Sequence, residues 1–274
     1  MKKNLLFLFL LFSLSKNTLA QHLELGAALG LSFYTGDLSH NLIATMGEGK
    51  GVYGVFLRQS MNEKFAIKAY FNHGTISGRD AHAKEEDLKL RDLSFRSKIN
   101  EVGLNFEYNI KGYEPEGMYQ PFSPYIFVGI NGFSYNPQTR YNNDWTDLRP
   151  LQTEGTSYKK ISVAIPVGGG VKFALNDHWN LGAELAFHPT VTDFLDDVSK
   201  NYISRDDLAA QSGQIAAELG NKINAATGVK RGNDSKFDWY HTLQITISYN
   251  FLDNGLIGSR RALRGRKGCK QSLF

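Results

Sequence analysis

Residues 238–251 read DWYHTLQITISYNF and alternate strictly in character. From Trp239 to Phe251 the odd positions are aromatic or aliphatic apart from His241, and the even positions between them carry hydroxyl or amide groups. Because neighbouring side chains of a strand point to opposite faces, such a segment needs apolar surroundings on one side and water or polar packing on the other. A transmembrane β-barrel provides both environments.

The N-terminus has the pattern of a secretory signal peptide. Lys2 and Lys3 precede an apolar run from Leu5 to Leu14, and Ala20 supplies a small residue before the cleavage point. We expect this leader, residues 1–20, to be removed. No other segment approaches the roughly 20 apolar residues that a membrane-spanning helix needs, so the sequence excludes a helical membrane protein.

The mature chain is predicted to form one domain, residues 21–252, followed by a basic tail, residues 253–274. Without the leader, basic and acidic residues nearly balance, but six cations and no acidic residue follow Asp253. The single Cys269 excludes an internal disulfide and argues against a lipoprotein anchor. The tail is a candidate periplasmic contact, with a disordered solubilising end as the alternative, and its cations are Arg260, Arg261, Arg264, Arg266, Lys267 and Lys270.

Eight segments have the alternating pattern, which predicts an all-β fold: an eight-stranded antiparallel transmembrane β-barrel with long extracellular loops and a helical insertion in the last loop. The expected strands are His22 to Gly36, Gly51 to Ser60, Phe65 to Ile76, Leu93 to Ile110, Phe122 to Tyr135, Ile161 to Leu175, Trp179 to Phe187 and Asp238 to Phe251. Leu93 and Phe95 are out of phase in the fourth strand, which predicts a bulge near Lys98. Pro166 removes one hydrogen bond from the sixth.

Loop lengths alternate between short and long along the chain, as in bacterial outer-membrane barrels with periplasmic turns and long outer loops. An even strand number then leaves both termini in the periplasm. A soluble lipocalin-like barrel is the alternative, since it turns the apolar row inward and the polar row to water. Aromatic residues near strand ends, such as Trp179 and Trp239, together with polar, glycine-rich opposite faces and the loop asymmetry, favour the membrane.

The polar row of the strands contains charged residues, and an eight-stranded barrel has an interior that side chains just fill. Near-balanced charge predicts a paired plug rather than a selective channel, because unpaired buried charges are costly. A proton or ion path is the alternative. The expected interior charges are Glu24, Arg58, Lys68, Glu101, Glu107, Lys172 and Glu184.

The last loop contains a cluster of carboxylates, Asp193, Asp196 and Asp197, which are candidates for an interaction at the loop surface. They could bind a divalent cation such as Ca²⁺, although Asp residues more often cap turns and helices, and we predict no metal site. A helix is expected from Asp206 to about Ala225, packing over the barrel mouth or meeting a partner. Its apolar side is predicted to comprise Leu208, Ile215, Leu219 and Ile223.

Catalytic motifs are nearly absent from the sequence. His188 at the end of the seventh strand, near Asp193, resembles the Asp and His pairs of outer-membrane proteases, and a rim-active hydrolase is therefore a minor hypothesis. There is no nucleophile elbow, phosphate-binding loop or Cys/His metal cluster, and we predict neither an enzyme nor a cofactor. The cations of the tail lack interleaved aromatic residues, so nucleic acid is not an expected partner.

Several short motifs together resemble a family of Bacteroidetes outer-membrane barrels that includes the PorG-type component of the type IX secretion system. They span about Leu23 to Phe251, and they are Tyr34-Thr35-Gly36-Asp37-Leu38, Leu93-Ser94-Phe95-Arg96, Phe122-Ser123-Pro124-Tyr125, Asn136-Pro137, Thr153-Glu154-Gly155 and the run from Thr192 to Ser199. The resemblance implies a non-enzymatic barrel associated with the periplasmic ring complex that supports secretion and gliding.

The sequence thus predicts an outer-membrane barrel that anchors or positions an envelope assembly, in contact with outer-membrane lipid, lipopolysaccharide and periplasmic secretion-ring proteins. The alternative is a small surface barrel that binds a ligand or lipopolysaccharide through its extracellular loops.

Overall fold

The computed structural model describes residues 23–39, 47–83, 85–114 and 120–251. The predicted leader and the basic tail with Arg260, Arg261, Arg264, Arg266, Lys267 and Lys270 lie outside these residues. The strands of the described chain are β1 (Leu23–Thr35), β2 (Lys50–Ser60), β3 (Phe65–Arg79), β4 (Ser94–Asn109), β5 (Phe122–Tyr141), β6 (Asp144–Asp147), β7 (Ile161–Ala164), β8 (Val167–Ala174), β9 (Trp179–Pro189) and β10 (Trp239–Phe251). The helices are α3 (Glu86–Arg91), α4 (Arg205–Ser212) and α5 (Gln214–Gly220), and short 3₁₀ turns span Asp80–His82 and Arg149–Leu151.

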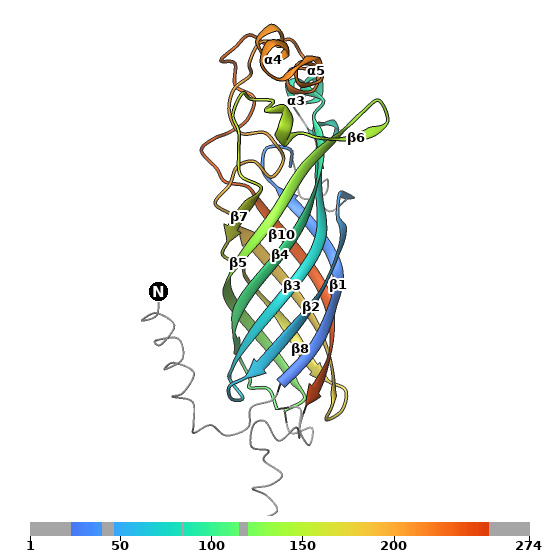
Figure 1. Ribbon diagram of the computed structural model, residues 1–274. Helices are drawn as coiled ribbons and strands as arrows, with labels where there is room; N and C mark the ends of the chain where they lie inside the picture. Colours follow the sequence, from blue (N-terminus) through green and yellow to red (C-terminus); the bar gives the residue numbers. More distant parts are fainter. Residues whose placement is uncertain (1–22, 40–46, 84, 115–119, 252–274) are drawn as a thin grey trace, which may run out of the picture.

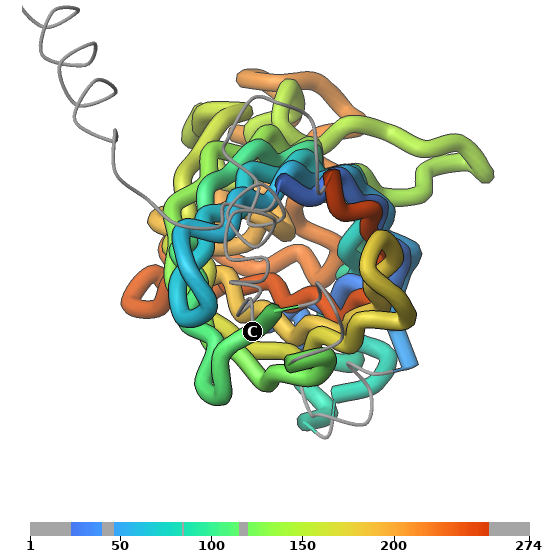
Figure 2. The backbone as a smooth tube through the Cα atoms, turned by 90° about the horizontal axis from the view of Figure 1, so that it is seen from below, coloured from blue at the N-terminus to red at the C-terminus, as the bar shows by residue number. Residues whose placement is uncertain are grey.

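The strands close into an antiparallel ring with eight positions, which confirms the predicted fold (Figures 1 and 2). β1 to β5 pair in sequence order, β5 pairs with both β7 and β8, and β8, β9 and β10 pair in order. The ring closes where β1 pairs with β10, from Leu23 opposite Phe251 to Thr35 opposite Trp239. β7 and β8 share the sixth position, because the strand is interrupted at Ile165 and Pro166. β6 extends β5 as a hairpin beyond the ring.

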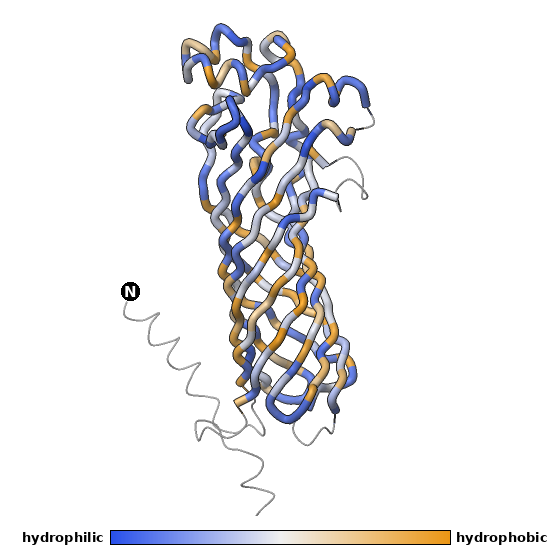
Figure 3. The backbone as a smooth tube through the Cα atoms, turned by 90° about the vertical axis from the view of Figure 1, so that its right-hand side faces the viewer, coloured by the Kyte–Doolittle hydropathy of each residue, from blue (hydrophilic) through white to orange (hydrophobic). Residues whose placement is uncertain are grey.

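The two faces of the wall have opposite chemistry. The outward row is apolar and open, with Leu29 69%, Ile130 62% and Ile245 64% exposed, whereas inward Glu24 and Glu107 are fully buried. Figure 3 shows the apolar residues as a broad belt around the half of the barrel that ends in the short turns. A soluble lipocalin-like barrel would have the reverse arrangement, so the structure excludes that alternative.

The predicted bulge near Lys98 is wrong. β4 keeps one register against β3, from Phe65 opposite Tyr108 to Arg79 opposite Ser94. The change of pattern has another cause: here the wall has risen above the apolar belt, so its outer face is polar and its inner face packs apolar Phe95 and Ile99. The phase of the strand is constant while its surroundings change.

The short connections lie at one end of the barrel and the long ones at the other, as predicted. Two of the turns use the same device. Asn62 Oδ1 accepts hydrogen bonds from the backbone N–H groups of Lys64 and Phe65, and Asn176 Oδ1 accepts them from His178 and Trp179. We call these ends the turn end and the long-loop end.

The helix expected from Asp206 to Ala225 is instead two short helices over the long-loop end (Figure 1). Gly213 separates α4 from α5 with a φ of +89°, which lies outside the helical region. Leu208 and Leu219 are buried as expected, but Ile215 is 41% exposed. The prediction of one continuous apolar side is therefore wrong, Ile223 beyond α5 also being exposed.

Candidate functional site

The lumen of the barrel contains all the charges predicted to point inward. Each is at most 5% exposed, and together they form what we call the lumen network: Glu24, Arg58, Lys68, Glu101, Glu107, Lys172 and Glu184. The strand periodicity places these residues inside, because inward side chains recur at every second position.

Arg58 on β2 is the centre of the lower part of the network. Its guanidinium contacts Glu24 (Nη1 to Oε2, 2.8 Å) on β1 and Glu107 (Nε to Oε2, 2.9 Å) on β4. Lys172 from β8 reaches the same Glu107 carboxylate at 2.5 Å and donates to Asn109. Four strands spread around the ring are thus joined by charged hydrogen bonds across the lumen.

Lys68 and Glu184 form a second buried ion pair between β3 and β9. Tyr125 donates its hydroxyl hydrogen bond to the same Glu184 carboxylate at 2.7 Å. The ammonium of Lys68 also lies 5.4 Å from the ring centroid of Phe127 and 5.6 Å from that of Tyr70. Aromatic rings therefore fill the space that the ion pairs leave.

Glu101 is stabilised mainly by neutral donors. Asn72 and Asn131 each donate to it at 2.7 Å, and the Tyr240 hydroxyl also donates to it. Nε2 of His188 lies 3.7 Å from the carboxylate. The alternation along each strand predicts that these neighbours point inward, but it does not predict which of them contact Glu101.

His188 lies inside the barrel and not at an open rim. It is 2% exposed, and its ring stacks on Tyr240 with centroids 4.2 Å apart and planes 7° apart. Its acidic neighbour is Glu101, whereas Asp193 lies in the long last loop. This burial removes the basis for a rim-active hydrolase at His188, because a substrate has no access to the imidazole.

Above the lumen network the inner face becomes a hydrophobic plug. Tyr34 packs edge-on against Phe95 at 4.8 Å, and Phe133 against Tyr240 at 5.5 Å. Leucine, isoleucine and valine side chains from the walls and from the long loops complete it. The buried residues of the plug are Tyr34, Leu38, Ile76, Leu93, Phe95, Ile99, Phe133, Tyr135, Ala164, Leu195, Val198 and Tyr240.

The long loops fold over this plug, and we call them the cap. The three loop carboxylates predicted as interaction candidates are buried inside the cap. Asp196 accepts from the Tyr34 hydroxyl at 2.7 Å and from the N–H of Val198 at 2.9 Å. Asp197 accepts from Thr153 and Tyr158, and Asp193 is 7% exposed. They face the interior of the cap, so the structure does not present them to an outside partner.

Two buried arginines complete the cap, and the sequence did not single them out. Arg231 contacts Glu154 at 2.9 Å and the carbonyl oxygen of Asp197 at 2.7 Å. Arg91 forms a two-pronged pair with Asp80, both contacts being 2.7 Å. Glu154 belongs to a motif of the family resemblance, and the motifs beginning at Tyr34, Leu93, Thr153 and Thr192 all meet here. The arrangement ties distant loops into one body.

Burial makes the cap carboxylates hard to ionise. It raises the pKa of Asp193 to about 7 and that of Asp197 to about 6. Burial raises the pKa of Asp196 and of Asp238 as well, with the charge of neighbouring Asp37 adding to the effect on Asp196. Among the described residues, no group of three or more His, Cys, Asp or Glu side chains is arranged to hold a metal ion.

We expect the cap to be more stable at pH 5 than at pH 8. Asp193 and Asp197 bind protons more tightly in the folded cap than in the unfolded chain, where the pKa is about 4. Their stabilising contribution is complete below pH 4 and is lost as the pH rises through about 6 to 7, by on the order of 1–3 kcal/mol. Hydrogen exchange of the backbone amides of residues 192–199 at pH 5 and pH 8, corrected for intrinsic rates, measures this change in stability. Asp193→Asn should reduce the pH dependence, and stronger protection at pH 8 would contradict the sign.

The chain matches one known protein family. The family described as "Domain of unknown function (DUF6089)" matches residues 2–259. No curated protein matches the chain in sequence. None of the helices in the described ranges is long and apolar enough to cross a membrane.

The solved structures that the chain resembles are similar only in general outline. Ail, the attachment invasion locus protein of Yersinia pestis, in complex with the heparin analogue sucrose octasulfate, has a TM-score of 0.43 at 9% identity, covering 85% of this chain and 100% of that one. The outer membrane protein OprG from Pseudomonas aeruginosa has a TM-score of 0.42 at 14% identity, covering 86% and 97%. Neisserial surface protein A has a TM-score of 0.42 at 8% identity, covering 84% and 97%.

Proposed function

The chain belongs to this family of unknown function, and we propose that it is a non-enzymatic barrel of the outer membrane that anchors or positions an assembly of the cell envelope. The observation that carries the proposal is the exposed apolar row on a closed ring of strands, whose charged side chains at the level of this row all point inward. Only a closed barrel satisfies every backbone hydrogen bond of membrane-crossing strands. The belt then faces lipid.

The filled lumen favours anchoring over conduction. Arg58, Lys172 and Glu107 meet across the interior, and the hydrophobic plug closes the space above them. A conducting pore needs a continuous polar passage, whereas an eight-stranded barrel encloses little more than its own inward side chains. The barrel is therefore suited to anchoring its loops and termini at the membrane, where other proteins can bind them.

Two surfaces are available for an assembly. At the long-loop end, the buried pairs of Arg91 and Arg231 keep the loops in one arrangement. At the turn end, β1 begins and β10 ends side by side, with Leu23 opposite Phe251, so the chain enters and leaves the barrel there. We place the turn end in the periplasm, where the basic tail would contact secretion-ring proteins. The finer proposal is a component of a type IX secretion assembly.

Co-purification from native membranes tests this proposal. After crosslinking, mass spectrometry of the wild-type complex should identify periplasmic ring proteins of the secretion system. A variant without residues 255–274 should recover them at least severalfold less, since clustered cations steer and hold an acidic partner surface. Arg260→Lys, Arg261→Lys, Arg264→Lys and Arg266→Lys together preserve the charge and serve as the control. Equal recovery with and without the tail would overturn the tail contact, and recovery of no ring protein would overturn the secretion role.

A further inference from the structure

The outer wall above the apolar belt carries an uneven distribution of charge. Every outward-facing lysine or arginine of the described strands lies on β3, β4 or β5, and these residues are Arg79, Arg96, Lys98 and Arg140. The outward rows of β1, β9 and β10 contain none. One side of the barrel is therefore basic at the level where its exterior changes from apolar to polar.

The three arginines line a groove of about 650 Å³ on the outer wall, and Lys98 follows Arg96 on the outward row of β4. The groove lies beside the β5–β6 hairpin, which leans away from the barrel in Figure 1. Arg79, Arg96 and Arg140 line it together with Ser77, Thr75 and Trp145. The guanidinium of Arg96 lies 3.5 Å from the ring centroid of Trp145, and that of Arg140 lies 5.4 Å from it. Stacking on Trp145 orients both guanidinium groups at the groove.

The positive charge of the groove is only partly balanced. Arg79 contacts Glu48 at 3.2 Å, whereas Arg96, Lys98 and Arg140 have no carboxylate partner among the described residues. Arg96 Nε donates to the neutral amide oxygen of Gln138 at 3.1 Å. Guanidinium groups arranged in this way match phosphate oxygens, which can accept two hydrogen bonds from one arginine.

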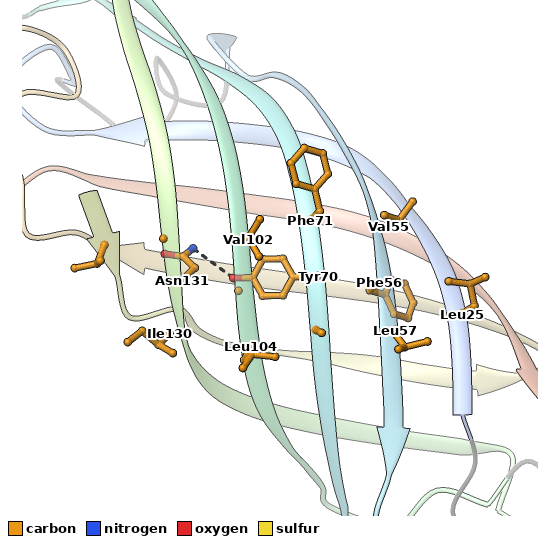
Figure 4. Close-up of a pocket in the computed structure, with 14 residues that line it drawn as sticks. Leu25, Val55, Phe56, Leu57, Tyr70, Phe71, Val102, Leu104, Ile130 and Asn131 are labelled. Carbon is orange, nitrogen blue, oxygen red and sulfur yellow. Dashed lines mark hydrogen bonds between the residues drawn. The ribbon is translucent and has the colours of Figure 1, made fainter. Parts of the chain in front are cut away.

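An apolar hollow of about 700 Å³ lies lower on the same strands, within the belt (Figure 4). Val55, Phe71, Val102 and Ile130 line it, and outward Gly132, beside which a side chain would meet no atom within 4 Å, leaves part of the wall bare. On β4, Val102 follows the groove residue Arg96 by six positions, which is about 20 Å along a strand. The hollow and the basic groove thus face outward on one side of the barrel.

We propose that this side of the barrel binds a phosphorylated glycolipid of the surrounding leaflet, with its phosphates in the groove and its acyl chains in the hollow. The proposal rests on the proposed membrane position of the belt. A soluble phosphorylated sugar would use the groove alone and leave the hollow without a role. An amphipathic molecule uses both, and the separation of about 20 Å along β4 leaves room for a sugar headgroup between them.

Reconstitution with defined lipids tests the proposal. The full mature chain is placed in phosphatidylcholine nanodiscs that contain diphosphorylated lipid A or its dephosphorylated form, and native mass spectrometry measures the lipid retained. The groove variant is Arg96→Gln, Lys98→Gln and Arg140→Gln together. The control, with the same charge change, is Lys89→Gln, Lys200→Gln and Lys230→Gln, three exposed lysines of the cap. Heat-modifiable migration in gels reports folding and insertion separately.

The wild type and the control should retain the diphosphorylated lipid at least about tenfold better than the dephosphorylated one, and the groove variant should lose this preference. A wild type without the preference, or a groove variant that keeps it, would overturn the site. Inorganic phosphate or a phosphorylated sugar without acyl chains that competes as well as the lipid would also overturn it, in favour of a soluble ligand. Failure of the wild type to insert at all would count against the membrane position and not against the groove.

Discussion

Replacing Glu107 by alanine is expected to lower the free energy of unfolding of the barrel by about 3–5 kcal/mol. This carboxylate is fully buried and contacts both Arg58 and Lys172, at 2.9 and 2.5 Å. Without it, Lys172 loses its ion-pair partner and Arg58 keeps only Glu24, so buried positive charge is left uncompensated. Chemical unfolding of the reconstituted barrel, followed by tryptophan fluorescence, measures the change.

Two further variants separate this effect from general damage. Glu85→Ala, at an exposed loop position, should change the free energy of unfolding by no more than about 0.5 kcal/mol. Glu107→Leu combined with Lys172→Leu removes both ions and leaves the Arg58 and Glu24 pair intact, so it should recover much of the loss. If Glu107→Ala behaves like Glu85→Ala, the lumen network contributes nothing to stability.

Leu29→Arg is expected to destabilise the inserted barrel by about 2–4 kcal/mol, because it places a charge in the middle of the lipid-facing belt. Leu29 is 69% exposed and lies opposite Ile245 on β10, which is also exposed. In water, an arginine at so open a position would cost almost nothing. Equilibrium unfolding in phospholipid vesicles gives the difference from the wild type.

Ser134→Arg is the matched control for the belt. Ser134 also points outward, on β5, but beyond Ile130, where the outer face has become polar. The expected cost there is about 0–1 kcal/mol. Equal effects of the two arginines would mean that the apolar row does not contact lipid, and the membrane position would then be rejected.

The sequence was sufficient for the architecture, because strand periodicity is a local property. The alternation from Trp239 to Phe251 and its counterparts predicted eight strands, and the loop lengths predicted which connections share an end. The same parity placed Arg58 and Glu107 on the inward row, where the structure has them. Parity does not say at what height along the barrel two inward residues meet, because that depends on the stagger between strands.

Strand periodicity did not predict the structure near the cap. The break in pattern at Phe95 suggested a bulge near Lys98, but it marks the height at which the wall leaves the apolar belt. The helix expected over the last loop is divided at Gly213, which has a positive φ. The sequence did not predict this break, because a glycine can adopt either helical or left-handed φ values. His188 was placed at a rim and instead lies among Tyr240 and Glu101.

The sequence by itself thus determined which face of each strand each side chain occupies, because a period of two follows from backbone geometry. Only the tertiary structure decided the partners. Tyr34 and Asp196, or Glu154 and Arg231, are far apart in the chain and meet only when the ring closes and the loops fold over it. The same holds for the basic groove, whose cations come from three strands and share one surface because β3, β4 and β5 are adjacent.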